Sequence, residues 1–313
     1  MALTAIILAA GKATRMKSER VKVLHEICGR PMLSYVLDAC REAGVTRMFV
    51  VVGYDKERVM ATYANENDIT WVVQGEQKGT GHACLVCQEA VEKAGLGGGD
   101  TFVLCGDGPL IRAATLQKLL LTHQNEGATL TLATCLLPDS TGYGRIVRKD
   151  GKADGEVLAI VEQNDATPEQ QNIREVNPSY YIFRTNEIFK LLAQVQPNNK
   201  KGEYYLTDTL EIARRTGGKV AAVAAVPPED VLSINSRADL AEVNAVMQQR
   251  IQGEILASGV TLVSPGQTWI EFGVRIGQDT VLEPFTWIGL GAQIAANVTV
   301  KAGTVVPRNA VIS

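Results

Sequence analysis

Residues 8–24, "LAAGKATRMKSERVKVL", place five basic side chains and one acidic side chain in one short segment. The segment follows the apolar run 4–8, "TAIIL", which is typical of a buried strand. Arg15 offers a bidentate guanidinium fork and Lys22 a movable point charge. A strand that ends in small residues and cations is suited to holding the phosphates of a nucleotide.

The small residues Ala9, Ala10 and Gly11 let the backbone approach a ligand closely. The segment is not a P-loop, which needs G-x-x-x-x-G-K-[ST] leading into a helix, and it is not G-x-G-x-x-G. From these residues alone, a solvated basic loop remains the alternative to a phosphate site.

Strand-like and helix-like runs alternate along residues 1–135, which predicts an α/β fold with a mainly parallel sheet. Ligands of such sheets bind beyond the carboxyl ends of the strands, where the basic segment begins. Further strands are expected within 136–232. The expected strands are 4–8, 47–53, 69–74, 100–105, 128–135, 143–148, 157–162, 176–183 and 219–226, and the expected helices are 31–44, 81–94, 113–127 and 236–259.

Composition limits the class of protein. The chain has 313 residues, 46% hydrophobic and 21% charged, enough for one large domain or for two. A net charge of −3 argues against binding nucleic acid or an anionic membrane through bulk electrostatics. No run approaches the roughly 18 apolar residues of a membrane helix, and no basic residue precedes the first apolar run as in a secretory signal. A cytoplasmic protein is predicted.

Six cysteines in so long a chain do not indicate a disulfide framework. Cys84 and Cys87 form a lone C-x-x-C, and the chain has only three histidines. Buried free thiols are therefore expected rather than a zinc site.

The last segment has a period of six. Gly277 and Gly289 each follow one of its aliphatic residues, and small or β-branched residues recur four positions after each aliphatic residue. This pattern predicts a hexapeptide β-helix, usually left-handed, of little more than two coils. So short a stack has open ends and is expected to pack on copies of itself as a trimer. The aliphatic positions are Ile270, Ile276, Leu282, Ile288, Ile294, Val300 and Val306.

The opening loop resembles L-x-x-G-x-G-T-x-M-x(4–5)-K, the signature of sugar-phosphate nucleotidyltransferases. Further motifs resemble the N-acetylglucosamine-1-phosphate uridylyltransferase family, whose bacterial members continue into a left-handed β-helix acetyltransferase. These motifs are "QGEQKGTGHA", "GDGPLI", "TGYGRIV", "AIVEQNDAT", "REVNPSYY", "KGEYYLTD" and "SINSRADL". The resemblance implies a Rossmann-like domain over 1–235, with a mixed, mainly parallel sheet, a linker helix over 236–258 and a short β-helix over 259–313.

The resemblance also implies a reaction. An oxygen of N-acetylglucosamine 1-phosphate attacks the α-phosphorus of UTP, and pyrophosphate leaves in line. Arg15 and Lys22 would be catalytic, by positioning and compensating charge. Asp107 and Asn235 would hold Mg²⁺, which takes few protein oxygens and fills its shell with phosphate and water. Without the family, Asp107 is equally well explained by an Asx turn and Asn235 by a helix cap.

The resemblance assigns other residues to substrate. Gln74 would read uracil by donating to O4 and accepting from N3–H, with a water-facing strand end as the alternative. Gly144, Glu162 and Asn177 match sugar-binding positions, although Glu162 alone would suit a surface carboxylate. Backbone groups would contact the nucleotide at Leu8, Ala9, Ala10, Gly11, Gly79, Thr80, Gly81 and Gly106.

Three departures from the family pattern matter. Ala13 replaces the second glycine of the signature, and Pro178 and Ser179 stand where Thr-Gly is usual after Asn177. Residues 253–313 contain no histidine, the residue that serves the family's acetyl transfer as general base, so no acetyltransferase activity is predicted. Transfer of another nucleotide, another sugar 1-phosphate as acceptor, and a non-catalytic nucleotide-sugar-binding subunit remain alternatives.

Overall fold

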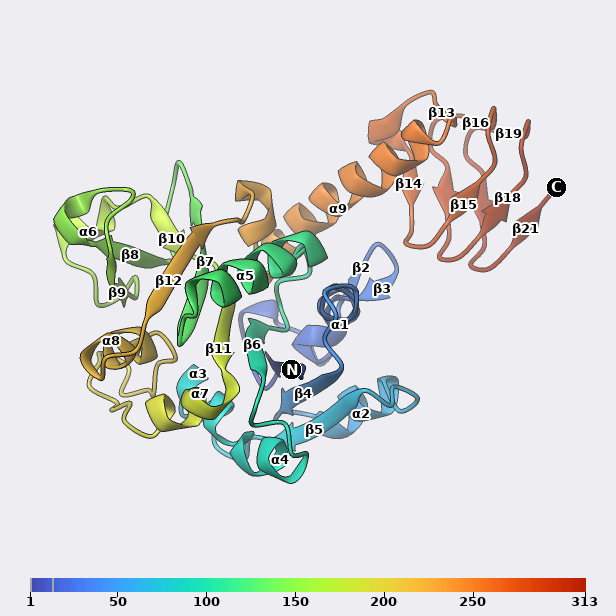
Figure 1. The fold of residues 1–313 in the computed structure, drawn as a ribbon. Coiled ribbons are helices and arrows are strands. Elements are labelled where there is room, and N and C mark those ends of the chain that lie inside the picture. Colours follow the sequence, from blue (N-terminus) through green and yellow to red (C-terminus); the bar gives the residue numbers. More distant parts are fainter. Residues whose placement is uncertain (1, 13) are drawn as a thin grey trace.

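The computed structural model describes residues 2–12 and 14–313, so Ala13, which replaces the second glycine of the signature, lies outside the described residues. One sheet dominates the first 224 residues, with strand order β5-β4-β1-β6-β11-β7-β10-β8-β9 and β12 beside β7 (Figure 1). The strands β5, β4, β1 and β6 run parallel, whereas β11, β10 and β9 run antiparallel to their neighbours. The strands are β1 (Leu3–Leu8), β4 (Arg47–Val52), β5 (Ile69–Val73), β6 (Asp100–Cys105), β7 (Leu130–Leu136), β8 (Gly144–Arg148), β9 (Val157–Val161), β10 (Glu175–Asn177), β11 (Tyr181–Arg184) and β12 (Val220–Ala224).

Helices cover both faces of this sheet, because alternate strand residues enter separate cores. Ile7 and Val50 belong to the core that includes residues of α1, α5 and α9, and Ile6 and Val51 to the core that includes residues of α3, α4, α7 and α8. The predicted α/β fold is thus confirmed. The helices are α1 (Met32–Glu42), α2 (Lys56–Thr62), α3 (Thr80–Leu85), α4 (Gln88–Lys93), α5 (Ala113–Glu126), α6 (Pro168–Gln171), α7 (Thr185–Leu192), α8 (Asp208–Arg215) and α9 (Arg237–Ala257), with 3-10 turns η1 (Thr14–Met16), η2 (Lys22–Leu24), η3 (Lys149–Gly151), η4 (Pro228–Val231) and η5 (Pro265–Gln267).

Two expected elements are divided. The helix predicted over 81–94 is broken between α3 and α4. The strand predicted over 176–183 is split into β10 and β11, because Pro178 has no N–H for a ladder and Ser179 has a φ of +65°. All six cysteines are free, as expected, and all but the half-buried Cys105 are buried.

The last segment is a short parallel β-helix. Two-residue strands stack into three three-stranded sheets, β13-β16-β19, β14-β17-β20 and β15-β18-β21. Equivalent aliphatics pair between coils, as Ile270 does with Ile288 and Ile276 with Ile294, and the predicted inward positions are buried. The period of six is therefore confirmed. The strands are β13 (Thr261–Leu262), β14 (Trp269–Ile270), β15 (Arg275–Ile276), β16 (Val281–Leu282), β17 (Trp287–Ile288), β18 (Gln293–Ile294), β19 (Thr299–Val300), β20 (Val305–Val306) and β21 (Val311–Ile312).

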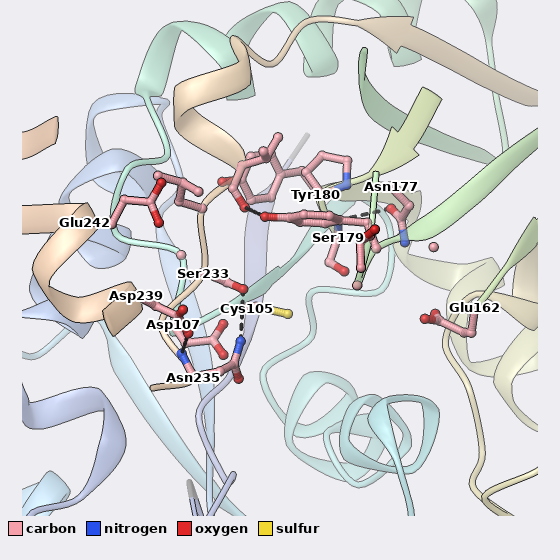
Figure 2. A pocket seen from close by; sticks show the side chains of 18 of the residues that line it. Cys105, Asp107, Glu162, Asn177, Ser179, Tyr180, Ser233, Asn235, Asp239 and Glu242 are labelled. Carbon is pink, nitrogen blue, oxygen red and sulfur yellow. Dashed lines mark hydrogen bonds between the residues drawn. The ribbon is translucent and has the colours of Figure 1, made fainter. Parts of the chain in front are cut away.

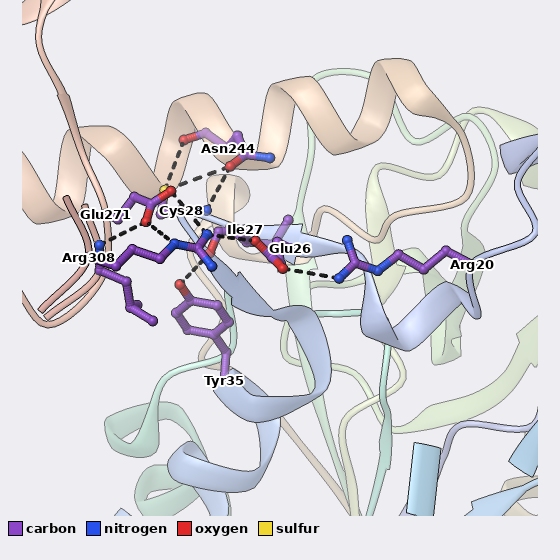
Figure 3. A network of polar contacts seen from close by, with 9 residues as sticks. Arg20, Glu26, Ile27, Cys28, Tyr35, Asn244, Glu271 and Arg308 are labelled. Carbon is purple, nitrogen blue, oxygen red and sulfur yellow. Dashed lines mark hydrogen bonds and ion pairs between the residues drawn. The ribbon is translucent and has the colours of Figure 1, made fainter. Parts of the chain in front are cut away.

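A hairpin of β2 (Glu26–Ile27) and β3 (Arg30–Pro31) attaches the β-helix to the large sheet domain (Figure 3). The Phe272 N–H donates to Cys28 O at 2.9 Å. Arg308 Nε lies 3.0 Å from Glu271 Oε2, and its Nη2 lies 2.9 Å from Glu26 Oε2. Glu26 also pairs with Arg20 of the basic loop at 3.0 Å. A chain of ion pairs thus joins the repeat to the segment that the sequence singles out.

Candidate active site

A cavity of about 470 Å³ opens beyond the carboxyl end of β6 (Figure 2). Its walls come from the end of β6, the starts of β8 and α9, and the segments after β9 and β10. Residues far apart in sequence therefore meet at the sheet edge where parallel α/β proteins bind ligands. The lining residues used below are Arg15, Cys105, Asp107, Tyr143, Gly144, Glu162, Asn177, Ser179, Asn235, Asp239 and Glu242.

Lys22 joins two of these lining residues. Its Nζ donates to Asp107 Oδ2 at 2.5 Å and to Asn235 Oδ1 at 2.9 Å. Only 10% of the Lys22 side chain and 22% of the Asp107 side chain are exposed. Two oxygens from distant parts of the chain thus converge on one cationic atom, which is stabilised by charge-assisted hydrogen bonds.

The start of α9 places Asn235 beside Asp107. The Ile234 N–H donates to Asp107 O at 3.0 Å, which ties the two loops together. Ser236 and Asp239 form a capping box, and Asp239 Oδ2 also accepts the Asn235 N–H at 2.8 Å. Local helix-cap chemistry therefore fixes the backbone that presents the Asn235 amide.

Arg15 lies in η1 and lines the same cavity, with its side chain exposed. The adjacent Met16 is 1% exposed, and its carbonyl accepts from Arg237 Nε at 3.1 Å. The first residue of α9 thus holds the η1 turn. Among the described residues no carboxylate pairs with Arg15, so its guanidinium is available to an anion. The structure brings Arg15, Lys22, Asp107 and Asn235 to one cleft.

The geometry fits a hard divalent cation. Asp107 Oδ2 and Asn235 Oδ1 lie within hydrogen-bond distance of the same Nζ, so a cation there can touch both oxygens. A carboxylate and an amide oxygen suit Mg²⁺, which leaves most of its sites to phosphate and water. Within 2–12 and 14–313 no cluster of three or more His, Cys, Asp or Glu residues is arranged to hold a metal.

The other end of the cavity collects the residues that resemble sugar-binding positions. Burial raises the pKa of Glu162, to which the Thr207 hydroxyl donates at 3.4 Å. A Cβ on Gly144 would lie 3.0 Å from Ile160 Cγ2 and 3.7 Å from both Glu162 Cδ and Asn177 Cβ. The floor is therefore a glycine backbone flanked by a carboxylate and an amide, which hydroxyls of a sugar can approach.

Asn177 also stabilises the wall of the cavity through hydrogen bonds to its neighbours. Its Nδ2 donates to the Tyr181 hydroxyl at 2.5 Å, and its Oδ1 accepts the Ser179 N–H at 3.0 Å. These bonds hold Ser179 in its left-handed conformation, a region that favours glycine. The position where the family usually has glycine thus keeps a glycine-like backbone while adding a hydroxyl beside Cys105.

The remaining predicted residues lie outside the lining of this cavity. The Gly106 N–H donates to Leu8 O, and the Ala9 N–H donates to Val51 O, each at 2.9 Å. Ala10 O accepts from Gln77 Nε2. These backbone groups at the end of β1 are therefore already hydrogen-bonded within the protein, whereas Gly11 is exposed.

The glycine-rich turn before α3 departs from expectation in one respect. The Gly81 N–H donates to Tyr204 O at 2.8 Å, so it is not available to a ligand. Thr80 Oγ1 accepts the Leu206 N–H at 3.0 Å, and a Cβ on Gly79 would lie 2.6 Å from Tyr204 O. This turn packs closely against the segment that precedes α8.

Gln74 follows β5 and is 4% exposed. Its Nε2 lies 3.0 Å from His82 Nδ1 and 3.4 Å from Gly79 O. The predicted donation from this amide to uracil O4 therefore competes with bonds inside the protein.

Several lining residues were not singled out from the sequence, among them Cys105, Tyr143, Asp239 and Glu242. Burial raises the pKa of Cys105 to about 12, which keeps its thiol protonated. Asp239 had a readable signal, the Ser-x-x-Asp spacing of a capping box, and Glu242 lies one turn further along α9. Tyr143 belongs to the quoted motif "TGYGRIV" but was given no role; its hydroxyl donates to Val231 O at 3.3 Å.

Comparisons with known proteins agree with this geometry. Residues 5–145 match the family described as MobA-like NTP transferase domain. Two solved structures of UDP-glucose pyrophosphorylase, one complexed with UDP-glucose and one apo, have TM-scores of 0.63 and 0.64 at 21% and 20% identity. Each covers 80% of this chain, which covers 100% and 99% of them respectively. Residues 5–145 are thus similar to a nucleotidyltransferase domain, and the chain shares the fold of these two solved structures.

The chain is also similar to the bifunctional protein GlmU. The GlmU of Pelotomaculum thermopropionicum is 45% identical over 286 residues, 91% of this chain and 61% of that protein. Those of Pelobacter propionicus and Geobacter sulfurreducens are 40% and 41% identical over 96% and 97% of this chain, and 65% and 63% of theirs. The resemblance drawn from the motifs is confirmed, and the chain spans about three fifths of the length of these relatives. No helix in the described part of the chain combines the length and apolarity that a bilayer crossing requires.

Proposed function

We propose that the protein transfers UMP from UTP to N-acetylglucosamine 1-phosphate, releasing pyrophosphate and forming UDP-N-acetylglucosamine. The observation that carries this proposal is the convergence of Lys22, Asp107 and Asn235, with Arg15 in the same cavity. Similarity to GlmU proteins and the motif resemblance support the nucleotide and the sugar.

The proposed reaction needs no acid–base pair. The attacking oxygen of the sugar phosphate is already ionised at neutral pH; it bonds to the α-phosphorus while the bond to the pyrophosphate oxygen breaks. The barrier arises mainly from bringing anions together. Arg15 and Lys22 lower it by holding and neutralising the phosphates, and Glu162 and Asn177 orient the sugar at the opposite end of the cavity.

We propose Mg²⁺ as the metal, held by Asp107 and Asn235. When bound, it supplies positive charge to the phosphate oxygens. Because Lys22 contacts both residues in this structure, its ammonium group would have to leave Asp107 and Asn235 for the same oxygens to hold a metal, and it would then be free to contact phosphate.

The β-helix carries a candidate subunit interface. Trp269 and Trp287 stack with ring centroids 5.4 Å apart on the β14-β17-β20 face. Trp287 is 44% exposed, and Val305, its neighbour in the next coil, is 68% exposed. Such an exposed apolar stripe on the β-helix favours the proposed trimer through residues 259–313.

The remaining parts of the proposal follow from this assignment. Residues 1–235 would form the catalytic domain, 236–258 the linking helix and 259–313 the repeat. UTP is a cytoplasmic nucleotide, so the protein would act in the cytoplasm. Residues 253–313 supply no histidine as a base, so we expect this chain to give no product from acetyl-CoA and an amino-sugar phosphate; clear product formation would contradict that.

A substrate panel tests the function. Purified protein is incubated with each nucleoside triphosphate and several sugar 1-phosphates, and pyrophosphate is measured with and without Mg²⁺. Release that needs UTP, N-acetylglucosamine 1-phosphate and Mg²⁺ together supports the proposal. Preference for another pair would reassign the substrates, and binding without release would indicate a non-catalytic subunit.

A further inference from the structure

The side chain of Gln74 is held in one orientation by the protein. Its backbone N–H donates to Val52 O at 2.8 Å, which fixes the residue at the shared ends of β4 and β5. Its carboxamide nitrogen makes the 3.0 Å bond to His82 Nδ1 and the longer contact with Gly79 O. Both amide protons thus have partners inside the protein, and no hydrogen bond between described residues uses Oε1.

This arrangement also defines the state of His82. A ring nitrogen that accepts an amide proton is itself unprotonated, so the imidazole carries its proton on Nε2. His82 is half-buried and lines a cavity of about 310 Å³ with Lys78, Leu85 and Tyr204. That cavity has room for water to accept the Nε2 proton.

Gln74 lies beside the loop that begins at the end of β1. A Cβ on Gly53 would lie 3.1 Å from Ala10 O and 3.4 Å from Gln74 O, so these backbones meet at one sheet edge. Because Nε2 is held by His82 Nδ1 and Gly79 O, the side-chain oxygen Oε1 is the polar atom of the Gln74 carboxamide that is left for a nucleobase next to the loop. An oxygen acceptor pairs with the N3–H of uracil, whereas N3 of cytosine is itself an acceptor.

We propose that His82 is a positioning residue that locks the Gln74 carboxamide with its oxygen toward the base, and so makes the site select uracil over cytosine. The inference rests on the proposed uridylyl transfer and deepens it. Without an acceptor at position 82, the carboxamide turns over by rotation about its last side-chain bond. Its NH₂ group then faces the base and pairs with N3 of cytosine.

The test compares kcat/KM for UTP and CTP, with the sugar phosphate held constant. In His82→Leu the ratio of kcat/KM for UTP to that for CTP falls by about tenfold or more. Leucine accepts no hydrogen bond, so the Gln74 carboxamide no longer loses its bond to residue 82 when it turns over. His82→Asn offers its side-chain oxygen near the position of Nδ1 and keeps the ratio within about threefold of the wild type. Gln196→Leu alters the same cavity away from Gln74 and leaves the ratio unchanged.

Two results overturn the role of His82 alone: an unchanged ratio in an active, folded His82→Leu protein, or a His82→Asn protein that behaves like His82→Leu. A wild-type protein that does not use UTP at all overturns the proposed function and this inference with it. The tautomer provides a readout that needs no variant. Nitrogen-15 NMR of the wild-type His82 ring is expected to show a protonated Nε2 and a bare Nδ1, and the reverse tautomer contradicts the proposal.

Discussion

Replacing Lys22 by Met separates its catalytic role from its structural one. The variant keeps most of the aliphatic stem but removes the ammonium that contacts Asp107 and Asn235 at 2.5 and 2.9 Å. Breaking a fully buried pair costs about 3–5 kcal/mol. This pair borders an open cavity that lets water reach Asp107, so we expect a smaller loss of unfolding free energy, about 2 kcal/mol.

The loss of activity is expected to exceed that loss of stability. A cation that contacts phosphate in the transition state is worth about 10²–10³-fold in kcat, on the scale of removing one donor from a developing anion. Pyrophosphate release measures kcat, and denaturant unfolding measures stability. Lys17→Met is the matched control, because Lys17 belongs to the same loop, is exposed and has no ion pair among the described residues.

A folded Lys22→Met protein whose kcat stays within about threefold of the wild type would remove Lys22 from the mechanism. A Lys17→Met protein that loses as much activity as Lys22→Met would do the same, because the effect would then come from the net charge of the loop and not from the pocket.

Three further predictions concern the fold and its assembly. Gly29→Ala places a Cβ 2.5 Å from Glu271 Oε2 at a φ of +83°. Denaturant unfolding should therefore show that the free energy of unfolding falls by about 1–3 kcal/mol. An unchanged unfolding midpoint would contradict the packing of the β2-β3 hairpin on the β-helix. Burial, with Glu211 nearby, raises the pKa of Asp208 from 3.8 to about 6, so its ionisation opposes folding and stability is lost as pH rises from about 4 to 6. Asp208→Asn should therefore unfold at a higher temperature than the wild type at pH 7.5 and lose this advantage near pH 4; an equal advantage at both pH values would exclude this cause. Trp287→Glu places a charge on the exposed apolar stripe of the β-helix, so light scattering should show a smaller assembly than the wild type. An unchanged mass would show that this stripe is not the subunit interface.

Much of the fold could be predicted because its signals are local. Residues 4–7 and the inward aliphatic positions from Ile270 to Val306 are buried, as the sequence patterns require. The division of the strand expected over 176–183 could also have been suspected from Pro178, which cannot complete a ladder. The left-handed backbone of Ser179 was not predicted, although Ser179 stands where the family usually has glycine and Asn177, two residues earlier, can accept its N–H.

The residues of the site could be predicted from the sequence, but the hydrogen bonds between them could not. Sequence motifs named Lys22, Asp107 and Asn235, yet only the fold reveals that one ammonium contacts both oxygens. Likewise, Gln74 was assigned to the base without its partner His82, because contact between them depends on how β5 leads into α3. Hydrogen bonds between side chains of separate elements leave no period in the sequence.

A crystal structure of the protein with UTP and Mg²⁺ would locate the nucleotide and the metal. We expect the triphosphate in the cavity beyond β6, the metal in contact with oxygens of Asp107 and Asn235, and Arg15 and Lys22 on the phosphates. A nucleotide bound on another face, or a metal that touches neither Asp107 nor Asn235, would rule out this active site.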